Sequence, residues 1–548
     1  MRNRDRMLRG ALASLILAAG LLTGCGAAGE TAPAPAESQS PAESAPAAAE
    51  SGVSEPETAE PGPESGQEAA ESAQAEPEEP QEGKVLNIYC GNLEFQTRVK
   101  DHYPGYEEVD AMTGKIGDVD VVWTITPFDG NAYQDSLDEV LPDNGESADP
   151  VDLFVIESEY AYKYVNAEKE VTEKIADLGI TEEELKDQFP YTKDAVTDGD
   201  GTLRALTWQC CPGALIYNRE AAKAVLGSDE PEKVQEAVKD WDAFRDTAAR
   251  MKEAGYQMTA SAFDSYRVFV NHMSEPWVKD GEITEDQALA EWSEMEKTDV
   301  DAGRTAVCDI WGDEWNRGFY PEGKVFCYFG PAWLINYSMK SEDSASVAAA
   351  GGWGAVKGPS GFFWGGTWIA AARGTDNPTL AADIMRKMTT DPDIMREIRD
   401  RDYDFVNNRP VMEEAAAGEG YAVPVLGNQN PAGVFIESAD DAGRAPGSAY
   451  DAVCSEEYRK AMRSWFEGSA DRDTALEQYR AAVKERCPEL AETESASSEV
   501  SSSEETSSEE TASEETSSEE ASSEEASSSE ETSSEETAPE ETASEETE

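Results

Sequence analysis

The order of apolar and polar positions divides residues 84–490 into short apolar runs and longer stretches with helical periodicity. The apolar runs predict strands at Val85–Tyr89, Asp120–Ile125, Val151–Ile156, Leu203–Trp208, Ala214–Asn218, Val325–Phe329, Trp353–Val356 and Thr367–Ala372. The periodic stretches predict helices at Glu94–Tyr103, Val234–Ala254, Thr379–Thr390, Pro392–Arg401, Glu456–Phe466 and Arg472–Lys484. Because strands alternate with helices and several strands are apolar throughout, the pattern predicts an α/β fold with mainly parallel sheets covered by helices.

Two long flanks lack such a pattern. Residues 26–83 consist almost entirely of Ala, Pro, Glu, Ser and Gly, and residues 491–548 repeat variants of Ser-Ser-Glu-Glu-Thr. Neither segment has enough apolar surface to offset the entropy of ordering, so we expect a disordered tether and a disordered, acidic tail. The region between them, 84–490, is long enough for one large or two ordinary domains.

The N-terminus has the order of an export signal. Arg2, Arg4, Arg6 and Arg9 precede the apolar stretch Leu12–Leu22, which is shorter than the roughly 20 residues of a spanning helix. The following Leu-Thr-Gly-Cys, ending at Cys25, resembles a bacterial lipobox. That resemblance implies a signal peptide at 1–25, acyl chains on Cys25 and attachment to the extracellular face of the cell membrane.

The charge of the chain narrows the class of partner. The whole chain has a formal net charge of −70, of which residues 84–490 carry −37. Nucleic acid is excluded as a partner because its affinity for proteins depends on Lys and Arg contacts to phosphates. Strongly anionic small molecules are disfavoured for the same reason, whereas neutral or cationic ligands fit better.

Cysteine usage indicates neither a metal site nor a disulfide framework. Of eight cysteines, Cys25 belongs to the lipobox, and the remaining seven cannot all pair. The adjacent Cys210 and Cys211 make strained partners for one another, and no CxxC spacing typical of zinc occurs. We therefore expect mostly small buried hydrophobes and no metal, with Cys308–Cys327 and Cys454–Cys487 bridges left open.

The stretch GPSGFFWGGTWIA, residues 358–370, places large aromatic rings among glycines. Glycine weakens a strand interior and often marks a place where a ligand comes close. Trp364 directly precedes a glycine pair, which favours a ring exposed for stacking. Trp368 lies inside the predicted strand that follows, which favours a place in the core.

Five segments in order resemble the extracellular solute-binding proteins of carbohydrate ABC transporters, the maltose-binding-like group. They are KVLNIYCGNLEFQTRVKDHYPGYE, DPVDLFVIESEYAYKYV, LRALTWQCCPGALIYNRE, KVFCYFGPAWLINY and GGWGAVKGPSGFFWGGTWIAAARGTDNPTLAADIMRKMTTDP. The resemblance implies a two-lobed periplasmic-binding-protein-like fold of type II, with lobe 1 at 84–208 and 366–402 and lobe 2 at 211–357 and 408–490. Crossings between the lobes are expected near 205–212, 357–366 and 402–410, and the lobes are expected to close on the ligand.

The same resemblance implies a set of ligand contacts. They are Asn92, Glu94, Glu159, Trp208, Gln209, Trp333 and Trp364. Helix capping remains an alternative for the first two residues, a solvated face for Glu159, and a core position for each tryptophan. Trp311 and Trp315, one helical turn apart, are predicted to share a core face.

The resulting expectation is a monomeric binding protein without cofactor or catalytic residues. It would hold a small-molecule carbohydrate between its lobes and hand it to ABC permease subunits. The sequence has two His, no HExxH, no GxSxG with a His partner and no Gly-rich phosphate loop. A binder of another small solute, such as a peptide, and a secreted glycan-degrading enzyme remain alternatives, the latter because acidic pairs could arise anywhere in so acidic a chain.

Overall fold

The computed structural model describes residues 82–128, 131–167, 169–418, 420–443 and 445–491. The predicted signal peptide with Cys25, nearly all of the tether and nearly all of the acidic tail lie outside the described residues. The chain divides into two units, 1–491 and 492–548, and all described residues belong to the first.

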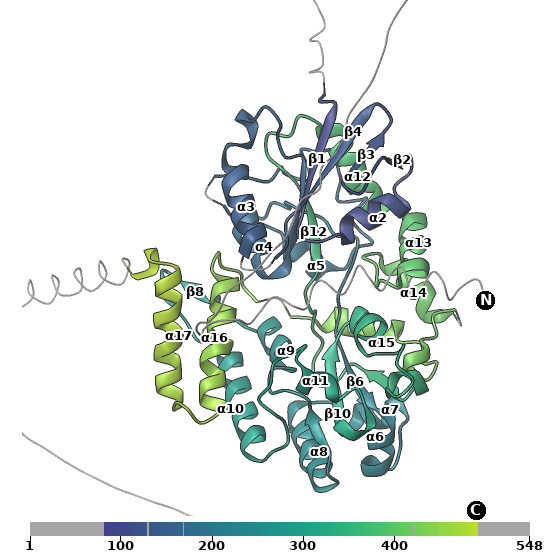
Figure 1. The fold of residues 1–548 in the computed structure, drawn as a ribbon, viewed down its shortest axis with the longest axis vertical. Coiled ribbons are helices and arrows are strands. Elements are labelled where there is room, and N and C mark those ends of the chain that lie inside the picture. The colour runs from purple at the N-terminus through teal and green to yellow at the C-terminus, as the bar shows by residue number, and fades with distance from the viewer. Residues whose placement is uncertain (1–81, 129–130, 168, 419, 444, 492–548) are drawn as a thin grey trace, which may run out of the picture. The chain divides into compact units, whose positions relative to one another are not determined.

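The first sheet has six strands in the order β12-β5-β1-β4-β3-β2. Their bounds are β1 (Val85–Cys90), β2 (Tyr106–Glu108), β3 (Thr113–Ile116), β4 (Val119–Ile125), β5 (Leu153–Glu157) and β12 (Thr367–Ala371). The central strand β1 runs parallel to both β4 and β5, with Ile88 opposite Trp123 and Leu153. Figure 1 shows helices on both faces of this sheet, which agrees with the nearly complete burial of the central strand β5.

The second sheet has four strands in the order β11-β6-β10-β7. They are β6 (Ala214–Asn218), β7 (Gln257–Thr259), β10 (Val325–Gly330) and β11 (Trp353–Val356). Strand β6 pairs antiparallel with both neighbours, whereas β10 and β7 are parallel. A separate two-stranded ribbon consists of β8 (Val278–Lys279) and β9 (Glu282–Ile283).

The prediction of mainly parallel sheets was wrong, since both sheets are mixed. Strand β12 reaches the first sheet from the second and pairs antiparallel with β5. Strands β3 and β4 are joined by a tight turn at Gly117, whose φ of 61° suits glycine, and must also run antiparallel. The predicted strand Leu203–Trp208 is not a strand, because this segment contributes only isolated bridges, such as Leu206 to Ile369.

The helices follow the predicted periodic stretches closely, with one break. They are α2 (Glu94–His102), α3 (Ala132–Val140), α4 (Ala161–Val165), α5 (Pro190–Asp194), α6 (Arg219–Leu226), α7 (Pro231–Ala237), α8 (Trp241–Glu253), α9 (Tyr266–Asn271), α10 (Gln287–Asp301), α11 (Asp313–Arg317), α12 (Pro378–Thr390), α13 (Pro392–Asp402), α14 (Arg409–Ala417), α15 (Ala432–Asp441), α16 (Asp451–Phe466) and α17 (Arg472–Arg486). The predicted helix Val234–Ala254 is two helices, α7 and α8. Asp240 starts the second one by accepting a hydrogen bond from the Ala243 backbone N–H at 2.8 Å.

The chain passes between the two sheets in three segments that lie side by side. The first and third are joined by the Cys210 N–H, which donates to the Phe405 carbonyl at 2.8 Å. The first and second are joined by the Trp364 N–H, which donates to the Cys211 carbonyl at 2.7 Å. Asn407, fully buried, donates from Nδ2 to the Thr207 carbonyl at 3.1 Å. These contacts hold together the segments predicted as crossings.

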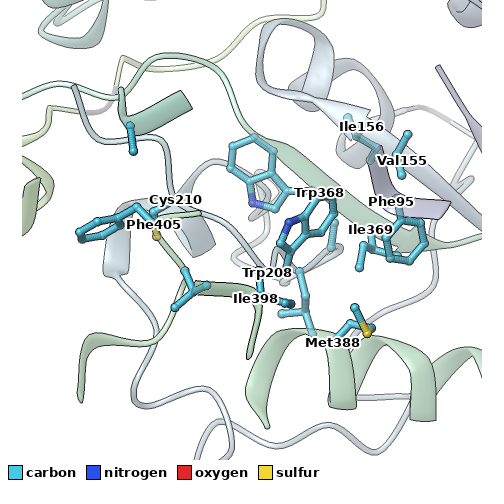
Figure 2. Close-up of a cluster of buried hydrophobic side chains, with 14 of the residues drawn as sticks. Phe95, Val155, Ile156, Trp208, Cys210, Trp368, Ile369, Met388, Ile398 and Phe405 are labelled. Atoms are coloured by element: carbon cyan, nitrogen blue, oxygen red, sulfur yellow. The ribbon is translucent and has the colours of Figure 1, made fainter. Parts of the chain in front are cut away.

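Between the crossings and the first sheet lies a buried apolar cluster, shown in Figure 2. Trp208 is fully buried and stacks on Phe95 with ring centroids 5.5 Å apart. Trp368 is also buried and donates from Nε1 to the Thr192 carbonyl at 2.7 Å. Its predicted core position is confirmed.

The seven described cysteines are free and buried. The expectation of small buried hydrophobes is confirmed, and neither of the two open pairings is formed. Burial raises the pKa of the Cys308 thiol to about 11 and that of Cys454 to about 12. These thiols therefore stay protonated and unreactive at neutral pH.

Candidate ligand-binding site

The glycine-rich segment between β11 and β12 leaves two of its aromatic rings, Phe363 and Trp364, only partly buried. Phe362 is fully buried against Phe329, whereas the side chain of Trp364 is only half-buried. The ring of Trp364 meets that of Trp333 at a centroid distance of 5.1 Å and that of Trp311 at 6.1 Å. The two predicted ligand residues Trp364 and Trp333 therefore belong to one cluster of three indoles.

Trp311 joins this cluster because of an unusual backbone. Its φ is 74°, in the left-handed region that bulky residues rarely adopt, and Asn316 Nδ2 donates to its carbonyl at 2.8 Å. Trp311 precedes α11 rather than lying in it, so the two tryptophans do not share a helical turn as predicted, although their rings do pack together with centroids 4.8 Å apart. Trp315 is buried, but Trp311 is half-buried. Such strained positions are concentrated at functional sites.

The three indoles line a small pocket at the end of β10. Its other lining residues are Asp264, Ile310, Trp315, Phe329, Gly330, Pro331 and Leu334. The cavity volume of about 10 Å³ is close to what one water molecule needs. A sugar ring therefore does not fit inside this pocket, although it could stack on the exposed part of the indoles.

Glu159, two residues beyond the end of β5, is connected to the indole cluster through an arginine. It forms an ion pair with Arg267 of α9. The Arg267 guanidinium lies over the Trp364 ring, 5.1 Å from its centroid. The ion pair therefore links the two sheets: Glu159 follows β5 of the first sheet, and α9, which contains Arg267, follows β7 of the second sheet.

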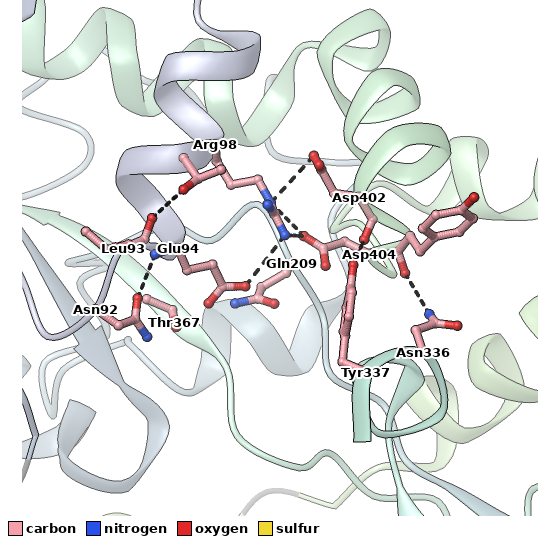
Figure 3. Close-up of polar contacts among 12 residues, drawn as sticks. Asn92, Leu93, Glu94, Arg98, Gln209, Asn336, Tyr337, Thr367, Asp402 and Asp404 are labelled. Carbon is pink, nitrogen blue, oxygen red and sulfur yellow. Dashed lines mark hydrogen bonds and ion pairs between the residues drawn. The ribbon is translucent and has the colours of Figure 1, made fainter. Parts of the chain in front are cut away.

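The other predicted polar contacts gather at the start of α2, as Figure 3 shows. Asn92 Oδ1 accepts a hydrogen bond from the Glu94 N–H at 2.8 Å, which is a helix-capping contact. The Glu94 side chain lies beside Gln209 and extends toward Arg98, with 3.8 Å between its carboxylate oxygen and the Arg98 Nη2. Gln209 itself is buried.

Arg98 is the centre of a buried charge network. Its Nε and Nη2 lie 3.0 and 2.9 Å from the same carboxylate oxygen of Asp404, and Asp402 is 3.8 Å away. Tyr337 contacts this segment from the second sheet's side by donating its hydroxyl to the Asp402 carbonyl at 2.5 Å. The network therefore ties α2 to the third crossing (Figure 3).

Two acids near this network are held partly protonated. Burial, against the opposing effect of Arg98, raises the pKa of Glu94 to about 7. Burial also raises the pKa of Glu157, at the end of β5, to about 8, although the Thr367 hydroxyl donates to its carboxylate at 2.8 Å. At neutral pH such groups can both donate and accept hydrogen bonds, which suits a ligand rich in hydroxyls.

The seven predicted site residues thus fall into distinct environments. Trp333 and Trp364 lie in the indole cluster, Glu159 is linked to it through Arg267, and Asn92, Glu94 and Gln209 gather near Arg98. Trp208 is fully buried, with no surface open to a ligand in this conformation. Among the described residues, no group of three His, Cys, Asp or Glu side chains is placed to hold a metal ion.

Sequence reasoning missed four residues of this region: Trp311, Asp264, Arg267 and Glu157. Glu157 ends an apolar strand at a position where ligand contacts gather, so its place gave a usable signal. Trp311 was assigned to a helix that begins two residues later. Nothing in the local sequence distinguishes Asp264 or Arg267 from the many other charged residues.

Comparison with known proteins agrees with this architecture. A family model described as bacterial extracellular solute-binding protein matches residues 108–425, more than half of the chain. Among curated protein sequences, none matches the chain significantly. Within the described ranges, no helix has the length and apolar character needed to cross a membrane.

Several solved structures share the fold at low sequence identity. A crystal structure of an extracellular solute-binding protein of family 1 is 17% identical, with a TM-score of 0.60, and the match covers 74% of this chain and 99% of that one. The sugar-binding protein MalE from Xanthomonas citri is 15% identical, with a TM-score of 0.55 and coverage of 74% and 98%. The galacto-N-biose-/lacto-N-biose I-binding protein from Bifidobacterium longum, in complex with lacto-N-biose, is 14% identical, with a TM-score of 0.54 and coverage of 75% and 99%. The two sheets with their helices are the two lobes of this fold, and the chain belongs to the bacterial extracellular solute-binding proteins.

Proposed function

We propose that this protein captures a carbohydrate between its two lobes and delivers the carbohydrate to the permease of an ABC importer. In this proposal, acyl chains on Cys25 hold the protein at the extracellular face of the cell membrane. The observation that carries the proposal is the cluster of half-buried indoles next to the crossings. Indole faces cover the apolar face of a sugar ring, and nearby polar groups satisfy its hydroxyls. The sugar ligands named for similar structures support the same ligand class.

We assign roles within this proposal from position and burial. Trp364 and Trp333 stack on a sugar ring. Glu94, Gln209 and Glu159 hydrogen-bond its hydroxyls, and Asn92 contributes beside its capping contact. Trp208 is fully buried and positions Glu94 indirectly, by packing on Phe95, the next residue of α2.

Calorimetric titration of the mature chain with a panel of neutral mono- and oligosaccharides tests this proposal. Trp364→Ala should weaken binding roughly tenfold or more, because stacking contributes about 1 kcal/mol beyond the lost buried area. Trp465→Ala is the matched control, since Trp465 is also half-buried but packs on Phe466 and Arg472 instead. If no sugar binds but a peptide does, the carbohydrate assignment fails while the transport role stands. Equal affinity of wild type and Trp364→Ala would remove that ring from the site.

Two further measurements address the finer parts of the proposal. We propose that the protein performs no chemistry on its ligand, so incubation with glycans should release no new reducing ends; hydrolysis would favour the enzyme alternative.

Attachment to the membrane is tested with Cys25→Ala, which should move the protein from the membrane fraction into the medium. A variant that stays in the membrane fraction would contradict anchoring through Cys25.

A further inference from the structure

The indole pocket contains a buried acid that has no basic partner. Asp264 lines the pocket and is only 3% exposed. Its carboxylate accepts hydrogen bonds from Trp315 Nε1 at 2.7 Å and from the Ser261 N–H at 2.8 Å. Both donors are neutral, and among the described residues no Lys, Arg or His forms an ion pair with this carboxylate. A buried carboxylate without a counter-charge is costly, so the position favours the approach of a cation.

The three indole rings around Asp264 face the pocket at different angles. Trp364 stands at 79° to Trp333 and at 81° to Trp311, whereas Trp311 and Trp333 are 34° apart with centroids separated by 5.8 Å. A cation within about 6 Å of an indole centroid is attracted by the ring, and several such rings form the aromatic cages that recognise ammonium groups. The aromatic walls and the unpaired acid therefore favour the same sign of charge.

Among the described residues, the one basic side chain in contact with the indole cluster is Arg267, and it leaves this preference in place. Arg267 lies over Trp364 but is not part of the pocket lining, and Glu159 neutralises its charge. That a guanidinium already rests on one of these rings also shows that the ring accepts a cation.

The size of the pocket selects among cations. A cavity volume of about 10 Å³ leaves room for a group the size of one water molecule. A primary ammonium group has about that size, whereas a trimethylammonium group is several times larger. The pocket therefore excludes a quaternary amine in this conformation.

We propose that the pocket formed by Trp311, Trp333, Trp364 and Asp264 binds a protonated primary amine of the transported solute, so that the ligand class is an amine-bearing sugar. This inference rests on the proposed carbohydrate-binding function and deepens it. The sugar ring stacks on the exposed part of the indoles, and its ammonium group enters the pocket to pair with Asp264.

The test is calorimetric titration of the mature chain with glucosamine, N-acetylglucosamine and glucose, each as the monosaccharide and the β-1,4-linked disaccharide. The amine should bind about tenfold more tightly than its neutral analogues, the size of effect that one cation–π contact produces. Asp264→Asn should reduce this preference, because it removes the negative charge beside the ammonium group and so weakens amine binding more than binding of the neutral sugar. Glu296→Gln is the matched control, because Glu296 is also a buried acid near Asp264, bonded to the Ser265 hydroxyl, but lies outside the pocket lining.

Proton release gives a second readout on the unmodified protein, in case Asp264→Asn disturbs the Trp315 and Ser261 contacts. Burial raises the pKa of Asp264 to about 7, and an ammonium group beside it would lower that pKa again. The titratable groups that face Asp264 are Glu296, Cys308, Cys327 and Tyr328, and all of them have raised pKa values. Amine binding near pH 7 should therefore release a fraction of a proton from Asp264, measured by titration in buffers of different ionisation heat.

The outcomes separate this inference from the proposed function. Equal affinity for amine-bearing and neutral sugars overturns the inference but leaves the carbohydrate proposal standing, because sugars still bind. Absence of amine binding at millimolar concentration also overturns the inference. Binding of putrescine, with no sugar bound, supports the ammonium pocket but overturns the carbohydrate proposal. An unchanged amine preference in Asp264→Asn, together with no proton release, also overturns the inference.

Discussion

Replacing Arg98 with methionine should destabilise the protein strongly, because among the described residues it is the only close positive partner of the buried Asp404 carboxylate. Arg98 is 8% exposed and Asp404 is 7% exposed, and two guanidinium nitrogens lie within 3.0 Å of one Asp404 oxygen. Methionine keeps much of the apolar stem, so packing changes little and the main effect is the loss of the charge. Removing one partner of a buried ion pair typically costs about 3–5 kcal/mol of unfolding free energy, and we expect Arg98→Met in that range.

The loss should depend on pH with a sign that follows from the raised pKa values. Burial raises the pKa of Glu94 to about 7 and also raises that of Asp404 above its ordinary value. An acid whose pKa is raised in the folded state does not lower the free energy of unfolding at a pH below its unfolded-state pKa. It lowers this free energy most at a pH above its folded-state pKa. Without Arg98 these pKa values rise further, so the loss in Arg98→Met should be largest near pH 8 and should shrink as pH falls toward about 5.

Urea unfolding followed by circular dichroism measures this loss at several pH values. Arg396→Met is the control, because Arg396 contacts Asp393 at 2.9 Å and Glu414 at 3.0 Å but its side chain is 40% exposed. An exposed pair of this kind contributes about 0–1 kcal/mol. The reasoning is refuted if Arg98→Met costs no more than Arg396→Met, or if its cost is the same near pH 8 and near pH 5.

Three further predictions concern the flanks, the thiols and the pH dependence of stability. Removing residues 26–83 and 491–548 should change the melting temperature by no more than a few degrees in scanning calorimetry, because such sequences add little packing; a larger drop would reveal a docked segment. The folded protein should resist alkylation by iodoacetamide near pH 8, whereas mass spectrometry after unfolding should find all seven described cysteines modified; rapid labelling of the native chain would contradict their burial. Burial raises the pKa of Asp451 to about 7, so stability should fall between about pH 4 and pH 7 as this acid ionises. Asp451→Asn should flatten that decline in thermal melts, and an unchanged slope would assign it to other groups.

The sequence could predict most elements because their apolar runs are long and their flanks are marked. Strands β1, β5 and β6 were found within a few residues, because β5 and β6 are buried almost throughout and β1 has a regular alternation of buried positions. The direction of the strands was predicted less well, because β12 and β6 enter their sheets from the opposite lobe, and a local apolar run carries no information about that. The run Leu203–Trp208 is apolar for another reason: it is buried in the first crossing, where only single bridges form.

The candidate site was predictable only where a local pattern set a residue apart. Trp364 stands out because glycines that cannot bury a large ring surround it, and the structure leaves that ring half-buried. Asp264 is one of 114 acidic residues, and its neighbours in the chain resemble those of many others. What distinguishes it is a contact across 51 positions to Trp315 and the approach of β10, both of which depend on the tertiary fold. Whether a charge has a partner depends on the three-dimensional surroundings of the side chain. The sequence therefore shows the acid, but only the folded chain shows that no basic side chain of the described residues pairs with it.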